Sequence, residues 1–456
     1  MSLTLETLPL LLRRRGALAD VLPVIGFAAS TAVSATVLGG LTAFIGRLPD
    51  GSASGPLPSG EESVAGFLVF CAAFATVLLV PSALALGGGA ARLSLARRER
   101  DLAAIRLIGG STGQVGGVAV LDVAAQCLLG SVFGIVAHLA VTPALTGLDF
   151  GIRPFTVGEL LLSWWAYPLL VLALVAMAAG SAAIALTGVV LSPLGVARES
   201  RNVRMSVVRL IIWVVLVALF LIAVNVLPQL FGAEAGTGVV LGIMVVTLGA
   251  MVAGVNIAGP FLVWLVARMV ARIAPWPALM VGARRLAADP RSGWRAVAGV
   301  TFAMVIAGFL TVITLLTSGS GASMEPSERM MVTALQTGGA LTMVIAAILA
   351  AVGTGVPQTA RVIDQAPTLR AQHVAGAQVG QLQRARLAEI SIPLVLSGIV
   401  ATGMVGLVLA STVSGALTNP QAIVTYLLAV VLAYAMVLGS VLVASPLVKR
   451  AALSPR

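Results

Sequence analysis

The sequence predicts an all-α polytopic membrane protein with about ten transmembrane helices. Hydrophobic residues make up 59% of its 456 residues and charged residues only 10%, whereas about 25% charged residues are typical of soluble domains. The apolar residues gather in runs that reach the roughly 20 helical residues needed to cross the hydrocarbon core of a bilayer. The ten runs lie near 22–46, 64–90, 115–140, 163–191, 207–227, 238–267, 296–318, 331–356, 388–411 and 421–448.

The first apolar run is predicted to be a retained helix. Arg13, Arg14 and Arg15 precede it, as basic residues precede the apolar part of a secretory signal. However, the run is longer than the roughly 7–15 apolar residues of such a signal. We therefore expect this segment to remain in the membrane.

The orientation follows from the basic residues in the loops. Of the 28 lysines and arginines, all but Arg47, Arg153 and Arg329 fall on one side of the ten-helix arrangement. Because cytoplasmic loops carry the excess of basic residues, both termini are predicted to be cytoplasmic. The cytoplasmic connections would be 92–114, 192–206, 268–295 and 357–387, and the outer ones 47–63, 141–162, 228–237, 319–330 and 412–420. No outer loop reaches the roughly 50 residues of a minimal domain.

Several classes of function are excluded by the residues present. The net charge of +11 would suit a nucleic-acid partner, but the charges are spread over short loops and form no basic face or tail. Cys71 and Cys127 lie inside apolar runs, and no cluster of metal ligands or catalytic triad is apparent. The sole lysine, Lys449, lies near the C-terminus outside any phosphate-binding loop motif. The chain is therefore predicted to be no enzyme, to hold no metal or cofactor and to bind no nucleic acid.

An internal repeat is visible in the two cytoplasmic segments that begin at Arg97 and Arg361. Each runs from charged residues through an apolar helical pattern to a small-residue break, and then enters the membrane past an acid. Gln114 corresponds to Gln381, and Asp122 to Glu389, at the same offset of 267. A second correspondence joins 12–20 to 283–291. These matches predict four helices in 1–191, two linking helices in 192–270 and four helices in 271–456, the two four-helix repeats being parallel as in some transporters.

At these segments the chain resembles the FtsX-like permease family, the membrane subunits of MacB-type (type VII) ABC transporters. In the first repeat, the resemblance rests partly on Ile105, Ser111, Gln114 and Asp122. It also rests on the residues that it implies contact an ATPase: Arg97, Arg98, Glu99, Leu102, Arg106, Gly109 and Gly110. In the second repeat the implied ATPase-coupling residues are Asp364, Arg370, Gly376 and Gln381. Members of the family commonly carry a large extracytoplasmic domain, which this chain lacks.

The resemblance implies a transmembrane permease subunit in the bacterial inner membrane. Its partners would be a soluble ABC ATPase, as a dimer that holds ATP and magnesium, together with membrane lipid and an amphiphilic substrate. With no outer domain, export of a lipid-like molecule, an antimicrobial peptide or an antibiotic is expected. The alternatives from other classes are an ATP-independent carrier built on a parallel repeat and a membrane scaffold or sensor that transports nothing.

Some residues carry two interpretations. The segment 92–114 is either a coupling helix or a solvated loop whose arginines only set the topology. Asp122 and Glu389 either have a functional role, as intramembrane acids often do, or make a structural hydrogen bond near the cytoplasmic end of their helices. Trp164, Trp165 and Tyr167 are typical of interfacial anchors. Because proline restricts the preceding residue, the second coupling helix is expected at about 367–376.

Overall fold

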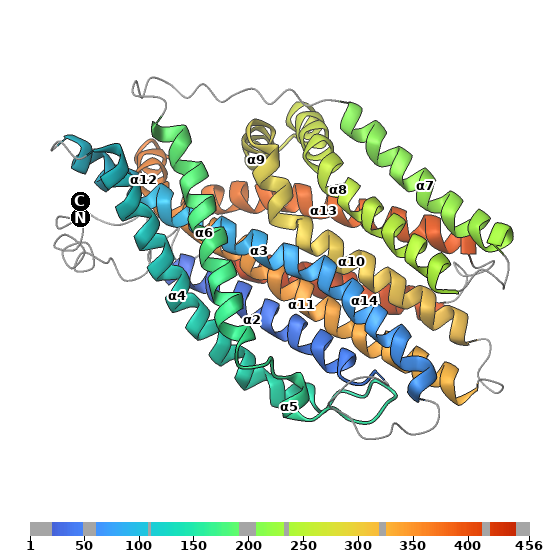
Figure 1. Ribbon diagram of the computed structural model, residues 1–456. Helices are drawn as coiled ribbons and strands as arrows, with labels where there is room; N and C mark the ends of the chain where they lie inside the picture. Colours follow the sequence, from blue (N-terminus) through green and yellow to red (C-terminus); the bar gives the residue numbers. More distant parts are fainter. Residues whose placement is uncertain are drawn as a thin grey trace. The chain divides into compact units, whose positions relative to one another are not determined.

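The computed structural model describes residues 21–48, 61–107, 111–190, 207–231, 237–318, 325–412 and 420–443 (Figure 1). Within these ranges the secondary structure is α-helical, with no strand. Among the described residues, six helices are long and apolar enough to cross a membrane, and each of the ten apolar runs overlaps a helix over most of its length. The chain is thus an all-α protein with the helices of a membrane-embedded protein. The six stretches are Val21–Ile45, Val64–Leu95, Gly113–Leu145, Ala166–Ile184, Pro326–Ile363 and Val379–Leu407.

Contacts divide the chain into two compact units, of which the first is Met1–Asn202 with Val356–Ile363. Its helices are α2 (Val21–Ile45), α3 (Glu61–Leu107), α4 (Thr112–Leu145), α5 (Val157–Leu160) and α6 (Ala166–Val190). Helix α2 packs against α3 and α4, and α6 packs against the same two helices. Gly130 and Gly134 of α4 permit this approach, because a Cβ atom at either would lie 2.5 Å from atoms of α2. Small residues commonly let membrane helices pack this closely.

Helix α3 continues without a break from the membrane segment into the first coupling segment. We expected a separate short helix there, but residues 92–107 form the last turns of the 47-residue α3. Two of the three glycines at 87–89 lie against other helices: Gly87 against Met177 and Ser30, and Gly88 against Ser181, whereas Gly89 has open space around it. The described part of the helix reaches Leu107, and Gly109 and Gly110 fall outside the described residues.

The second unit consists of Val203–Gly355 and Asp364–Arg456. Trp294, only 2% exposed, lies against Gly259, where a Cβ atom would overlap the indole ring. The Thr354 hydroxyl donates a hydrogen bond to the Ala296 carbonyl, which ties α11 to α10. The helices are α7 (Val208–Phe231), α8 (Thr237–Ile273), α9 (Pro277–Ala288), α10 (Pro290–Ser318), α11 (Pro326–Asp364, apart from Val356–Ile363, which belong to the first unit), α12 (Ala366–Val374), α13 (Val379–Thr412) and α14 (Pro420–Val443).

Two helices have matching bounds in the two units. Helix α4 starts at Thr112 and α13 at Val379, an offset of 267, and both contain 34 residues. At the same offset, α12 corresponds to the last nine residues of α3. The second copy is interrupted at Gln365, whereas the first is continuous. Helix α12 begins one residue earlier than expected, because Pro367 occupies the first turn, where no backbone donor is needed.

Candidate functional site

The first coupling segment is helical throughout its described part. Arg97, Arg98, Glu99, Leu102 and Arg106 all belong to the C-terminal turns of α3. A helix presents residues three or four apart on one face, so Glu99, Leu102 and Arg106 share a face. Gly109 and Gly110 lie outside the described residues. The described residues that the sequence predicted for this segment therefore all belong to one helix, which is continuous with a membrane span.

The helix that follows each coupling segment begins with the same kind of hydrogen bond, made by a glutamine side chain. In the first unit, the Ser111 amide donates to Gln114 Oε1 at 3.0 Å, and the Gln114 amide donates to Ser111 Oγ at 3.3 Å. In the second, the Gln378 amide donates to Gln381 Oε1 at 3.2 Å. A glutamine at the third helical position satisfies an amide that has no partner within the helix. This explains physically why glutamine occupies both repeat positions.

The second coupling segment has a tight turn in place of a long helix. Asp364 ends α11, and Arg370 lies in the nine-residue α12. Gly376 follows with φ of 100°, a left-handed conformation that favours glycine. His373 Nδ1 lies 2.9 Å from the Ala377 carbonyl oxygen and joins the end of α12 to the turn. Next to this turn, Val374 is 80% exposed and so lies on the surface of the unit.

The two intramembrane acids have different surroundings. Asp122 is 7% exposed, and its Oδ2 accepts a hydrogen bond of 2.8 Å from Gln126 Nε2 within α4. Glu389 is half-buried on α13 in the other unit. Position 393, which corresponds to Gln126 in the repeat, is a proline and offers no amide side chain. The hydrogen bond at Asp122 favours a structural role for that acid.

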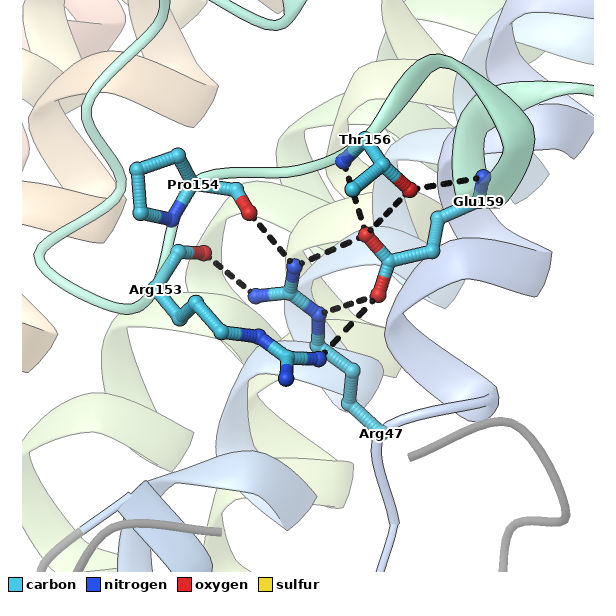
Figure 2. Close-up of polar contacts among 5 residues, drawn as sticks. All are labelled: Arg47, Arg153, Pro154, Thr156 and Glu159. Atoms are coloured by element: carbon cyan, nitrogen blue, oxygen red, sulfur yellow. Dashed lines mark hydrogen bonds and ion pairs between the residues drawn. The ribbon is translucent and has the colours of Figure 1, made fainter. Parts of the chain in front are cut away.

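An ion-pair cluster at one end of the first unit was not found from the sequence. Arg47, which directly follows α2, is buried, and Figure 2 shows its guanidinium enclosed by the segment before α6. Its Nε and Nη2 donate to the Glu159 carboxylate at 3.2 and 3.1 Å. The remaining donors reach the carbonyls of Arg153 at 2.5 Å and Pro154 at 3.0 Å. The guanidinium also lies 3.8 Å from the Phe155 ring centroid. We call Arg47, Arg153, Phe155, Thr156 and Glu159 the Arg47 cluster.

Glu159 is held in its charged form within this cluster. Burial alone would raise the pKa of its carboxyl, but hydrogen bonds from Arg47 and Thr156, together with the charge of Arg47, lower the pKa from 4.5 to about 2. The Thr156 amide donates to Glu159 Oε2 at 2.7 Å, and Arg153 Nη2 lies 3.3 Å from Oε1. Thr156 and Glu159 form a capping box around α5, a signal that the sequence does carry. Its partner Arg47 could not be read from that signal.

Beside this cluster, Gly39 and His138 bring further helices together. The Gly39 position lies so close to the Leu160 carbonyl that a Cβ atom there would overlap the oxygen. His138 of α4 is 1% exposed, with Nδ1 3.0 Å from Thr36 Oγ1 of α2 and its ring 6.0 Å from that of Tyr167. The described residues contain no group of three or more histidine, cysteine or acidic side chains placed to hold a metal ion.

Comparisons with protein families and with curated proteins found no match to this chain. The functional assignment consequently rests on the residues and their geometry.

Proposed function

We propose that this chain is the transmembrane permease subunit of an ABC transporter of the bacterial inner membrane. Its ten membrane helices would be arranged as four, two and four, with both termini in the cytoplasm. A soluble ATPase dimer would bind ATP and magnesium and supply the energy. The substrate would be amphiphilic or lipid-like, such as an antimicrobial peptide or an antibiotic, and would be exported.

The observation that carries this proposal is the repeated helix–turn–helix of the two coupling segments. In each unit, a helical coupling segment is followed by a 34-residue helix with glutamine at its third position. A short helical segment between two membrane helices can dock in a groove of another protein. Two such segments at the same offset suit an ATPase with two equivalent subunits.

The distribution of basic residues supports the proposed topology. The coupling segments, α9 and the N-terminal arginines share the side predicted to be cytoplasmic, and only Arg47, Arg153 and Arg329 are assigned to the other side. Arg47 is already neutralised by Glu159 at 3.1 Å. The ATPase sites would therefore face the compartment that contains ATP.

The substrate class follows from the outer connections. The connection between α4 and α6 folds back on the end of α2 through the Arg47 cluster. Many of the large apolar side chains of α4 and α6 are exposed, among them Val132, Phe133 and Leu172 at 60–65%. Such surfaces face lipid in a bilayer. A substrate that reaches the protein from the membrane therefore suits this chain better than a large soluble one.

The proposal is tested by purifying the full chain from its native membrane with and without its bound proteins. The chain alone should hydrolyse no ATP, and the native complex should contain an ABC ATPase at two copies per membrane chain. Addition of that ATPase should restore ATP-dependent transport in vesicles. ATP hydrolysis by the chain alone, or transport in vesicles that contain no ATPase, would contradict the proposal.

A further inference from the structure

The junction of α8 and α9 in the second unit carries a dense positive charge. Between residues 251 and 300 the sequence contains six arginines and a single acid, Asp289. Arg268 and Arg272 lie in the last turns of α8, and Arg284 lies on α9, which packs against α8. All three side chains are exposed, and none forms an ion pair with another described residue. Among the residues that the structure describes, these guanidinium groups therefore have no carboxylate that neutralises them.

Large apolar side chains are exposed among these arginines. Met269 is 53% exposed, Ile273 76% and Trp276 72%. Leu265, Met269 and Ile273 follow one another at intervals of four residues, so they form one stripe along α8. The stripe begins on the apolar part of the helix and ends at Trp276, beside Arg268 and Arg272. A surface that is both apolar and cationic matches the boundary between the hydrocarbon core and the lipid headgroups.

Helix α9 adds a second exposed face of the same kind. Its buried side, Gly282, Ala283 and Leu286, packs into the unit, with Gly282 against the Ala385 carbonyl of α13. The opposite side exposes Val281 and Arg284. A short helix with one buried side and one exposed side of mixed apolar and basic character suits a position at the membrane surface.

We propose that this surface, formed by Arg268, Met269, Arg272, Ile273, Trp276 and Arg284, binds the headgroup of an anionic phospholipid. The guanidinium groups pair with the lipid phosphate, since their forked donors match phosphate oxygens. The apolar side chains contact the first carbons of the acyl chains. The inference takes α8 as one of the ten proposed membrane helices and otherwise goes beyond the proposed transport function. A bilayer phospholipid is favoured over a docked protein because the arginines continue a stripe that faces lipid.

The test uses the purified full chain without any ATPase and titrates it with phosphatidylglycerol or phosphatidylcholine, with retained lipid measured by native mass spectrometry. One arginine near an anionic membrane surface contributes about fivefold in affinity. The double variant Arg268→Gln/Arg272→Gln should therefore lower phosphatidylglycerol affinity about 25-fold and leave phosphatidylcholine affinity unchanged. Arg92→Gln/Arg329→Gln, which removes two other exposed arginines, should change neither by more than about twofold.

Further measurements decide the outcome if the double variant folds poorly. Arg272→Lys keeps the charge and should keep the phosphatidylglycerol preference, and high salt should weaken binding by the unaltered chain. Equal binding of the two lipids, or equal losses in the two double variants, would mean that the arginines serve only topology and would overturn the inference. Loss of a co-purifying protein with unchanged lipid binding would identify a protein interface and would also overturn it. Because the lipid measurement uses the chain without an ATPase, a negative result would not contradict the proposed transport function.

Discussion

Arg47 and Glu159 are 112 residues apart in sequence, yet their side chains are joined by two hydrogen bonds of 3.2 and 3.1 Å. The pair fixes the connection between α4 and α6 to the end of α2. The guanidinium is almost completely buried, with a side chain 4% exposed. A buried charge of this kind is costly once its partner is removed, which makes the pair a sensitive point of the first unit.

Glu159→Gln should destabilise the first unit by about 3–5 kcal/mol, because Arg47 would stay buried without a counter-charge. Thermal unfolding in detergent measures the loss. Asp149→Asn is the matched control in the same connection: Asp149 is exposed and its Oδ1 accepts from the Gly151 amide at 2.7 Å. This variant should cost no more than about 1 kcal/mol. Equal losses would show that the Arg47–Glu159 pair contributes nothing of its own.

The contribution of Glu159 should depend on pH in the acid range. Since its pKa is lowered from 4.5 to about 2 in the folded protein, the stabilisation is complete above pH 4.5, declines as the pH falls, and is gone below about pH 2. It amounts to on the order of 2–3 kcal/mol. Pepsin digestion followed by mass spectrometry should therefore show faster cleavage within 148–162 at about pH 2 than at about pH 4. With rates divided by those of an unfolded reference peptide, which corrects for the pH dependence of pepsin itself, Glu159→Gln should remove the difference. A difference that persists in this variant would assign it to another group.

Gly39 and Gly40 offer a test of how closely the outer connection packs. Gly39→Ala should be destabilising by about 1–3 kcal/mol, because its methyl group would overlap the Leu160 carbonyl. Gly40→Ala, on the same helix with open space around it, should be neutral or stabilising by up to about 1 kcal/mol. Thermal unfolding of both variants measures the difference. If both variants unfold alike, Leu160 does not lie against α2 as described.

The proposed topology is checked by cysteine labelling in intact cells. In a chain with Cys71 and Cys127 replaced by alanine, a membrane-impermeant thiol reagent should label Gly55→Cys and Glu325→Cys from outside. Ser200→Cys should be labelled only after the membrane is permeabilised, because 192–206 is assigned to the basic, cytoplasmic side. Protection of position 55 or 325 in intact cells would overturn the ten-helix arrangement.

The two coupling segments should contribute unequally to ATPase binding. Glu99→Arg alters the continuous end of α3, whereas Asp364→Arg alters the last residue of α11, before the interruption at Gln365. An unpaired charge buried at an interface costs about 2 kcal/mol or more, and an exposed rim charge costs little. Glu99→Arg should therefore lower ATPase retention in a pull-down at least about 30-fold, and Asp364→Arg less than about threefold. Equal retention would mean that 92–114 serves only as a topology signal.

The helices could be predicted from the sequence because membrane burial imposes a simple requirement. A run of roughly 20 apolar residues has few alternatives to a helix, since backbone groups find no water in the bilayer core. Each of the ten runs accordingly overlaps a helix in the described part of the chain. The start of α13 was predictable for a local reason as well, because Gln381 closes the same turn as Gln114.

The remaining features depend on contacts between distant residues. The capping box of Thr156 and Glu159 can be read locally, but nothing near it points to Arg47. The continuity of α3 into 92–107 depends on the fold as well, because Gly87 and Gly88 pack against Met177, Ser30 and Ser181. The neighbours of His138, Thr36 and Tyr167, are distant in the sequence and meet it only when α2, α4 and α6 assemble.

The uninterrupted course of α3 has a mechanical consequence. At a rise of about 1.5 Å per residue, its 47 residues extend about 70 Å, more than twice the roughly 30 Å of a bilayer core. A tilt of about 10° applied at the Leu107 end would move the Glu61 end by about 12 Å if the helix turned as one rod. Helix α12 is only nine residues long and is joined to α11 through Gln365. A force applied to α12 would therefore rotate this short helix about Gln365. A force at the end of α3 would thus be carried along one helix that contains Pro81, whereas a force on α12 would turn that helix against α11.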